Sequence, residues 1–532
     1  MKRGIAIAFG LLFASAGLVA SEQADTLSHA GCAAPGDPVD PALLERPTVL
    51  RKDVGAVHQK VTTSSSEAQA FYDQGLTFLH HYVFIEAARS FHQALRSDPE
   101  CAMCWMGLAR AEQGLERREA TAAAIEKAQA LAALEAKASK KEQSFIALRA
   151  QQIEAQAAPS SEEKEKHAAY KAALDKALAS YPDDAELWII RGNAEEPGPW
   201  GRGQFGGSAS IAFHETALVR SPGHLGADHY LVHSFENIAH HAEAAEHGKI
   251  YAATSPGVAH AQHMYGHVLP RLGRWEEALA QFEKADAIEE AYAKAENLRP
   301  GDDWHHLHNL QLLGYTYLRL QRVSDAEKTF RRAFDTPARL PYRGTPQASL
   351  AEFYLLRGQP RDALAVARAL QVDTRTPATR VVATAVEGEA LLALGEMAEA
   401  QDAARRAKMR LDTARGQLGA EARYLDLYVA PYIQQLETEI ALHGKDPAEA
   451  EASIRKVAND LSQNPRFDAW GEGLFRLDRM ASDARRAGRT TLAADVEAKM
   501  KVIDPDYVPG ALSASRQAAR SKAASASRQA AR

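Results

Sequence analysis

The positions of small, aromatic and polar residues predict two packed helices within residues 68–101. Gly75 and Ala87 are small where two antiparallel helices would touch, and Phe78 and Phe91 are large enough to fill the space beside them. A proline near the end of the segment cannot continue the second helix. We therefore expect a helical hairpin of about 34 residues.

The same spacing recurs further along the chain. In the copies counted from Ala259 and Leu307 the matching residues are Gly266, Leu269, Ala278, Phe282 and Ala285, and then Gly314, Tyr317, Ala326, Phe330 and Ala333. A copy counted from Leu225 keeps Ala244 and Pro256, and weaker copies begin near Ala102, Ala185, Gly344 and Val381. Repetition at this period predicts stacked hairpins that share one continuous core.

This register resembles the tetratricopeptide repeat (TPR), and the phrase LGRWEEALAQFEKA at residues 272–285 is typical of that family. The resemblance covers roughly residues 67–415 and extends to an exported, histidine-rich bacterial subgroup. It implies an all-α fold, a right-handed α-solenoid of antiparallel helix pairs that forms a TPR-like superhelix. It also implies a scaffold that binds a protein or peptide in its concave groove.

Four stretches are not expected to form regular repeats. Residues 22–66 are expected to form an irregular lead-in, and the Gly- and Pro-rich residues 196–208 a loop between the two helices of one repeat. Residues 416–508 are predicted to be helices that cap the array, because a terminal repeat must cover its apolar face. Residues 509–532, in which SASRQAAR occurs twice, are expected to be a disordered basic tail.

The N-terminus predicts a secretory signal peptide over residues 1–21. Lys2 and Arg3 precede an apolar run that is short for a membrane span, and no second run of spanning length follows. We expect a periplasmic or secreted protein without a membrane span after cleavage; an uncleaved anchor is the alternative. The net charge of −6 argues against a nucleic-acid partner.

Cys101 and Cys104 form the pattern CAMCW. In an oxidising compartment they could close a short disulfide, which would be strained if both lay on one regular helix. The pattern lacks the following histidine that covalent haem attachment requires. A soft-metal pair remains an alternative to a structural or incidental one.

Histidines gather on the first helices of neighbouring repeats. The second, fifth, ninth and twelfth residues of a first helix lie on one stripe, and the resemblance implies that this stripe faces the groove. The stripe residues of three successive repeats are His229, His233 and Glu236, then His260, His263 and His267, and then His308, Gln311 and Tyr315. Asn193 takes the ninth position of an earlier repeat, and Tyr230 is a further candidate for contact with a ligand.

Two histidines four residues apart on a helix can share one metal ion, and rings on neighbouring helices can converge. His229, His233, His263 and His267 could supply four nitrogens to one ion. Glu236 would be a fifth ligand, or an acceptor that fixes the tautomer of one ring. His260 and His308 extend the candidate site. Such nitrogen donors suit zinc, copper, iron or nickel.

The alternative role for these histidines is to contact the backbone or side chains of a bound peptide. A peptide-binding scaffold and a metal-binding protein or metalloenzyme therefore both stay open. The HExxH metalloprotease motif is absent from the sequence, as is a phosphate-binding glycine loop. Asp302 or Asp303 is expected to cap the helix that follows them, in the segment DDWHHLHN.

Overall fold

The computed structural model describes residues 39–134, 136–338, 345–372, 375–418, 422–444, 447–463 and 469–512. Within these ranges the regular secondary structure is helical, and no β-strand occurs. No helix in the same ranges is both long and apolar enough to cross a bilayer. The predicted signal peptide, residues 1–21, and residues 513–532 of the predicted tail lie outside the described residues.

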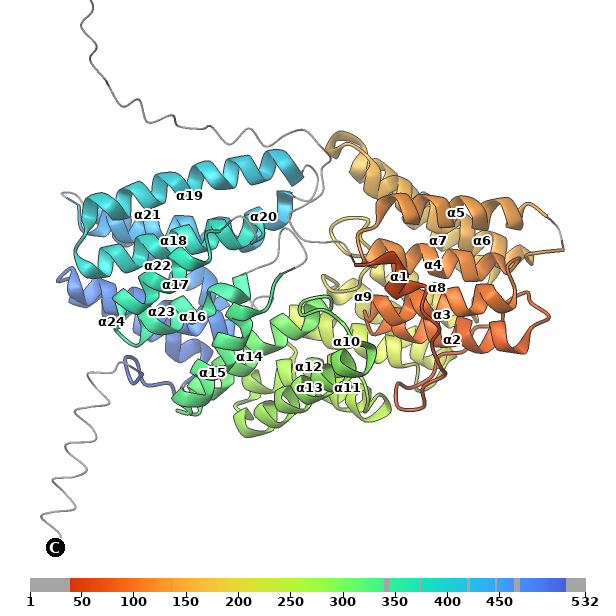
Figure 1. Cartoon of the computed structure of the whole chain (residues 1–532), viewed down its shortest axis with the longest axis horizontal. Coiled ribbons are helices and arrows are strands. Elements are labelled where there is room, and N and C mark those ends of the chain that lie inside the picture. The colour runs from red at the N-terminus through yellow and green to blue at the C-terminus, as the bar shows by residue number, and fades with distance from the viewer. Residues whose placement is uncertain are drawn as a thin grey trace, which may run out of the picture. The chain divides into compact units, whose positions relative to one another are not determined.

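Successive helices pack against each other in pairs (Figure 1). The pairs are α2 (Ser66–His80) with α3 (Phe84–Ser97), α4 (Ala102–Gly114) with α5 (Arg118–Ala132), α6 (Lys140–Ala157) with α7 (Ser160–Ser180), α8 (Ala185–Asn193) with α9 (Ser208–Arg220), α10 (Leu225–Asn237) with α11 (His241–Thr254), α12 (Ala259–Val268) with α13 (Trp275–Glu296), α14 (Trp304–Arg319) with α15 (Val323–Asp335), α16 (Thr345–Leu356) with α17 (Pro360–Ala369), and α18 (Pro377–Leu394) with α19 (Met397–Leu418). This arrangement confirms the predicted α-solenoid of antiparallel helix pairs.

Glycines and phenylalanines hold the pairs together as the repeat register predicts. Phe91 of α3 is fully buried between Gly75 of α2 and Gly107 of α4. A Cβ atom at Gly75 would lie 2.7 Å from the phenylalanine ring, and one at Gly107 would lie 2.3 Å from it. Gly314 faces the buried ring of Phe330 in the same way. Each glycine therefore allows a close helix approach that an alanine would block.

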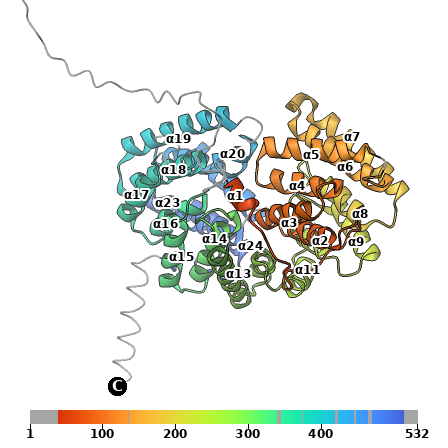
Figure 2. The ribbon, with the colours of Figure 1, turned by 45° about the vertical axis from the view of Figure 1, so that its right-hand side comes forward.

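Each pair also contacts the next along the chain, so that the order in space follows the order in sequence (Figure 2). The first helices α10, α12 and α14 contact one another in turn. A short 3-10 helix, Leu269–Leu272, continues α12 and ends at Gly273, whose φ is +69°. α13 has 22 residues where α11 has 14, so the third of these first helices follows a longer second helix.

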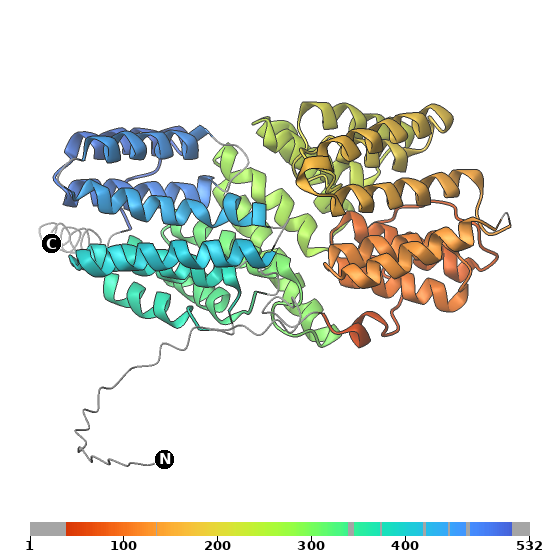
Figure 3. The ribbon, with the colours of Figure 1, turned by 90° about the horizontal axis from the view of Figure 1, so that it is seen from above.

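Helices after α19 pack beside the last pairs, with their blue ribbons next to the cyan ones in Figure 3. They are α20 (Ala422–Tyr428), α21 (Ala430–Leu442), α22 (Ala448–Gln463), a π-helical turn η3 (Ala469–Gly473), α23 (Leu474–Arg486) and α24 (Thr490–Ile503). The turn η3 contacts α14, and α23 contacts α16. This region therefore reaches back to the middle repeats. Before α2, the described residues hold one short helix, α1 (Pro41–Leu44).

Cys101 and Cys104 form a disulfide, with their Cα atoms 5.3 Å apart. Cys101 is the N-cap residue of α4, with φ −67° and ψ 97°, so only Cys104 belongs to the regular helix. The difficulty expected for two cysteines on one helix therefore does not arise.

Candidate metal centre

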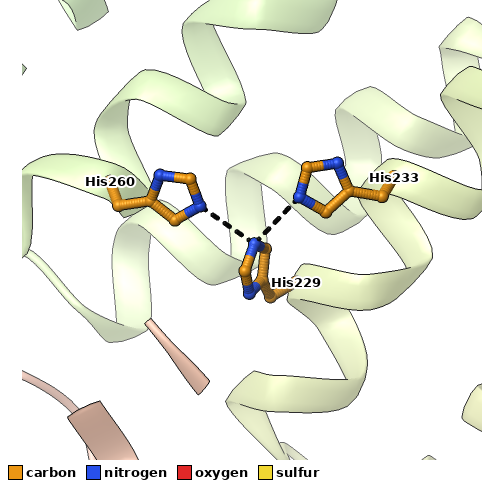
Figure 4. A group of neighbouring side chains, drawn as sticks. All are labelled: His229, His233 and His260. Carbon is orange, nitrogen blue, oxygen red and sulfur yellow. Dashed lines mark hydrogen bonds between the residues drawn. The ribbon is translucent and has the colours of Figure 1, made fainter. Parts of the chain in front are cut away.

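Two neighbouring first helices bring three histidine rings together (Figure 4). α10 supplies His229 and His233, one helical turn apart, and α12 supplies His260. Nε2 of His229 lies 3.1 Å from Nε2 of His233 and 3.0 Å from Nε2 of His260. We call these three residues the first triad. Their Nε2 atoms face a common point between the two helices.

A backbone carbonyl determines which nitrogen of His229 carries the proton. Nδ1 of His229 lies 2.6 Å from the carbonyl oxygen of His80, which can only accept, so we assign the proton to Nδ1. Nε2 of His229 then directs its lone pair toward both neighbouring rings. One lone pair cannot accept in-line hydrogen bonds from two N–H groups. A single ion, by contrast, can accept the lone pairs of all three rings.

The spacing of the three nitrogens fits a transition-metal ion. Bonds of about 2.0–2.1 Å in tetrahedral geometry place ligand nitrogens roughly 3.3 Å apart. The separations of 3.0 and 3.1 Å from His229 to its two neighbours are close to that value. Small ring rotations would therefore make the three nitrogens ligands of one ion.

Burial keeps the rings of the first triad neutral. It lowers the pKa of His229 and the pKa of His260 well below the ordinary value, and it lowers the pKa of His233 to about 4. A metal ion needs the unprotonated nitrogen. At neutral pH these rings therefore offer lone pairs without competition from protons.

Tyrosine rings pack around the first triad. The ring of Tyr251 stacks on His229 with centroids 4.9 Å apart. The centroid of Tyr82 lies 4.7 Å from that of His229 and 5.3 Å from that of His260. Tyr82 has a φ of 58°, in the left-handed region, at the turn between α2 and α3. These contacts limit rotation of the imidazoles, as the surroundings of a metal site commonly do.

Three further histidines lie beside the first triad. His263 and His267 come from α12 and His308 from α14, and their ring centroids are 5.1 to 6.3 Å apart. We call them the second triad. The four histidines expected to share one ion do not meet at one point, because the pair on α10 converges with His260, whereas His263 and His267 lie beside His308.

Hydrogen bonds orient two rings of the second triad. Nδ1 of His263 lies 3.0 Å from Oδ1 of Asn309, and Nδ1 of His267 lies 2.7 Å from Oε1 of Glu236. Burial alone would raise the pKa of Glu236, but the facing His267 holds it below the usual value. Of the two roles predicted for Glu236, the structure places it as a hydrogen-bond partner of a ring.

A cavity of about 260 Å³ opens beside both triads. The histidines that line it are His233, His260, His263, His267, His305 and His308. Gln311 lines the same cavity, and Glu472 and Arg476 of the C-terminal region close it on another side. The C-terminal helices therefore cover part of the predicted groove, so that the space next to the histidines fits a small ligand.

The Gly- and Pro-rich loop between α8 and α9 supplies Gln204 and Phe205 to the cavity wall. Asn237 at the end of α10 donates to the carbonyl oxygens of Gln204 and Gly206 at 2.8 and 2.9 Å. The buried carboxylate of Glu196 accepts hydrogen bonds from two backbone N–H groups of the loop, and burial raises the pKa of Glu196 to about 7. The loop is thus fixed to the helix that carries His229.

The residues expected in the groove have different surroundings. Gln311 lines the cavity, whereas Asn193, Tyr230 and Tyr315 are buried. Asn193 and Tyr230 hydrogen bond to buried histidines of other helices, and Tyr315 packs against aromatic rings. At the start of α14, Asp303 accepts a hydrogen bond from a backbone N–H at 2.9 Å, which confirms the expected N-cap.

Sequence reasoning missed a buried cluster formed by His80, Glu186 and His224. Oε1 of Glu186 lies 2.9 Å from Nε2 of each histidine. Burial would raise the pKa of Glu186, but the two histidines hold it well below the usual range. The residues come from α2, α8 and the N-cap of α10, so no stripe on a single helix could indicate them.

Because both rings share one carboxylate oxygen, we interpret this cluster as a hydrogen-bond network that joins three helices. It fixes His80, whose carbonyl orients His229. The repeat register also does not predict a contact for His305, whose ring centroid lies 4.4 Å from that of His260. The reason is that His305 lies at the start of α14, before the stripe residues counted from Leu307.

No protein family model matches the chain, and no curated protein sequence matches it. Solved structures that it resembles include a tetratricopeptide repeat protein from Parabacteroides merdae, 14% identical over 52% of this chain and 98% of that chain, with a TM-score of 0.35. Yeast Tom70 is 11% identical over 82% of this chain and 89% of that chain, with a TM-score of 0.36. At these scores the likenesses carry no argument about function.

Proposed function

We propose that the protein is a transition-metal-binding helical-repeat protein that holds an ion on the first triad. The observation that carries the proposal is the convergence of three Nε2 atoms, 3.0 and 3.1 Å from His229 to its two neighbours. Hydrogen bonding explains only part of this arrangement, because Nε2 of His229 has one lone pair and two facing rings. An ion in the middle would be a partner for all three.

The donor set limits the class of metal. Three imidazole nitrogens suit zinc, copper, nickel or iron and do not suit magnesium or calcium, which prefer oxygen ligands. His233 and His260 also line the cavity of about 260 Å³. A metal with three protein ligands keeps a position for a further ligand, and that position would face the cavity. We therefore propose binding of a small molecule or anion at the ion.

Export to an oxidising compartment is part of the proposal. The disulfide between Cys101 and Cys104 supports it, because structural disulfides persist mainly outside the cytosol. The basic and apolar pattern of residues 1–21 supports it independently. The mature protein should therefore be prepared from the periplasm or the medium, and its metal content measured without added chelators.

The test compares His233→Ala with His240→Ala. His233 is half-buried at the cavity, whereas the side chain of His240 is 54% exposed and pairs with Glu243. His240→Ala is therefore the matched control. We expect His233→Ala to weaken zinc binding at the first triad by at least tenfold in calorimetric titration, and His240→Ala to leave it unchanged. Circular dichroism checks that both variants remain helical.

A second variant, His260→Ala, removes the ligand that α12 supplies and should show the same loss. Unchanged zinc affinity in both triad variants would overturn the proposal. A wild-type protein that binds no zinc, copper, nickel or iron in the micromolar range would also overturn it. The remaining function would then be binding of a peptide in the groove, which the repeat scaffold also implies.

A further inference from the structure

We infer that the second triad, His263, His267 and His308, is a second metal site, built by the same rule as the first and one repeat further along. The inference rests on the proposed function for its chemistry, because both sites use three imidazoles. It goes further in that it assigns two ions to the chain and places both beside one cavity.

The first argument is the repeat register. In the first triad the ligands are the fifth and ninth residues of α10 and the second residue of α12. In the second triad they are the fifth and ninth residues of α12 and, counted from Leu307, the second residue of that repeat on α14. His263 and His267 each follow their counterparts on α10 by 34 residues. The longer α13 explains why His308 follows His260 at a greater distance in sequence.

The second argument is the shape of the two triangles of rings. In the first triad the centroid distances are 4.9 Å between fifth and ninth positions, 4.9 Å between fifth and second, and 6.5 Å between ninth and second. In the second triad the same three distances are 5.7, 5.1 and 6.3 Å. Three imidazoles on a tetrahedral ion have centroids roughly 5 Å apart. The ring centroids of the second triad are therefore spaced nearly as three imidazoles on one ion would be, and rotation of the rings would bring their nitrogens together.

The third argument is the hydrogen bonds at the Nδ1 atoms. Oδ1 of Asn309 can only accept, so it holds the proton of His263 on Nδ1, and the carboxylate of Glu236 does the same for His267. In both rings the lone pair is then on Nε2. This is how a carboxylate or carbonyl partner orients a metal-binding histidine, and His80 serves His229 in the first triad in the same way.

The two sites would share one cavity wall. The rings of His260 and His263, which belong to different triads, have centroids 5.9 Å apart and stack nearly parallel. Five of the six triad rings line the cavity. A small ligand with oxygen or nitrogen donors could therefore reach both ions at once, which distinguishes this arrangement from a single structural ion.

The test counts metal ions in the purified mature protein by zinc titration and by cobalt absorption spectroscopy. We expect about two equivalents in the wild type and about one in either His233→Ala or His308→Ala. These variants are a matched pair, because both rings are half-buried at the cavity. The double variant should bind none, and His240→Ala should keep both.

His267→Ala provides a second test of the same site and should also lose one equivalent. If the wild type binds a single equivalent that only His233→Ala removes, the second site is refuted while the proposed function stands. If His308→Ala and His267→Ala keep two equivalents, the second site is likewise refuted. A wild type without bound metal refutes both proposals.

Discussion

The carboxylate of Glu236, at the end of α10, lies 2.7 Å from Nδ1 of His267 on α12. The glutamate is buried, and its carboxylate accepts a hydrogen bond from a ring that belongs to the next repeat. This contact joins the helix of the first triad to a ligand of the second. It also gives Glu236 a defined role that can be separated from metal coordination itself.

Replacing Glu236 by glutamine should weaken zinc binding at the second triad by about 10- to 100-fold, because the ring of His267 loses a charged acceptor that raises its basicity. Calorimetric titration would measure the affinity of each site. Glu243→Gln is the control, since Glu243 lies on α11 with its side chain 52% exposed. Equal effects of the two changes would contradict the assigned role.

The metal-free protein should lose stability as the pH falls from 6.5 toward 3. Burial lowers the pKa of His81 to about 3, so between these values the unfolded chain binds a proton that the folded chain does not. Each such histidine reduces the free energy of unfolding by about 1.4 kcal/mol per pH unit. Urea unfolding at pH 6.5 and 5 with a chelator present would measure the effect.

His81→Gln isolates the contribution of that residue. Nε2 of His81 lies 2.8 Å from the carbonyl oxygen of Val54, and glutamine can still donate a hydrogen bond there without titrating. We expect the change in unfolding free energy between pH 6.5 and 5 to shrink by about 2 kcal/mol. An unchanged pH dependence in this variant would show that His81 titrates normally in the fold.

Gly107→Ala should destabilise the protein by about 1–3 kcal/mol, because the added methyl group overlaps the buried ring of Phe91. Thermal or urea unfolding would measure the loss. Gly416→Ala is the matched control: Gly416 is an exposed helical glycine with open space around its Cβ position. Alanine there should be neutral or stabilising by up to about 1 kcal/mol. Combining Phe91→Leu with Gly107→Ala should restore part of the stability that Gly107→Ala loses.

The sequence predicted the helix pairs well because each pair depends on local spacing. Gly75 and Phe91, for example, are placed by helical periodicity within a single hairpin. The same counting identified His229, His233, His263 and His267 as stripe residues. Information of this kind is contained in each repeat and needs no knowledge of how repeats stack.

The grouping of the rings could not be predicted in the same way. Whether His263 joins His233 or His308 depends on the offset between successive first helices, which the packing of whole side chains decides. The cluster around Glu186 joins three helices from distant parts of the sequence, so it has no local signal. The C-terminal residues that close the cavity are equally remote, because Arg476 lies far along the chain from α10.

In each triad the third ring comes from the following hairpin. An ion bound there would act as a cross-link between consecutive units of the array, resisting the sliding and unwinding motions by which solenoids flex. A single hairpin would supply only two rings and would bind the ion weakly. Metal binding would therefore indicate that consecutive hairpins are stacked correctly. Loss of both ions would release two joints in the middle of the array, and the chain would become more flexible there.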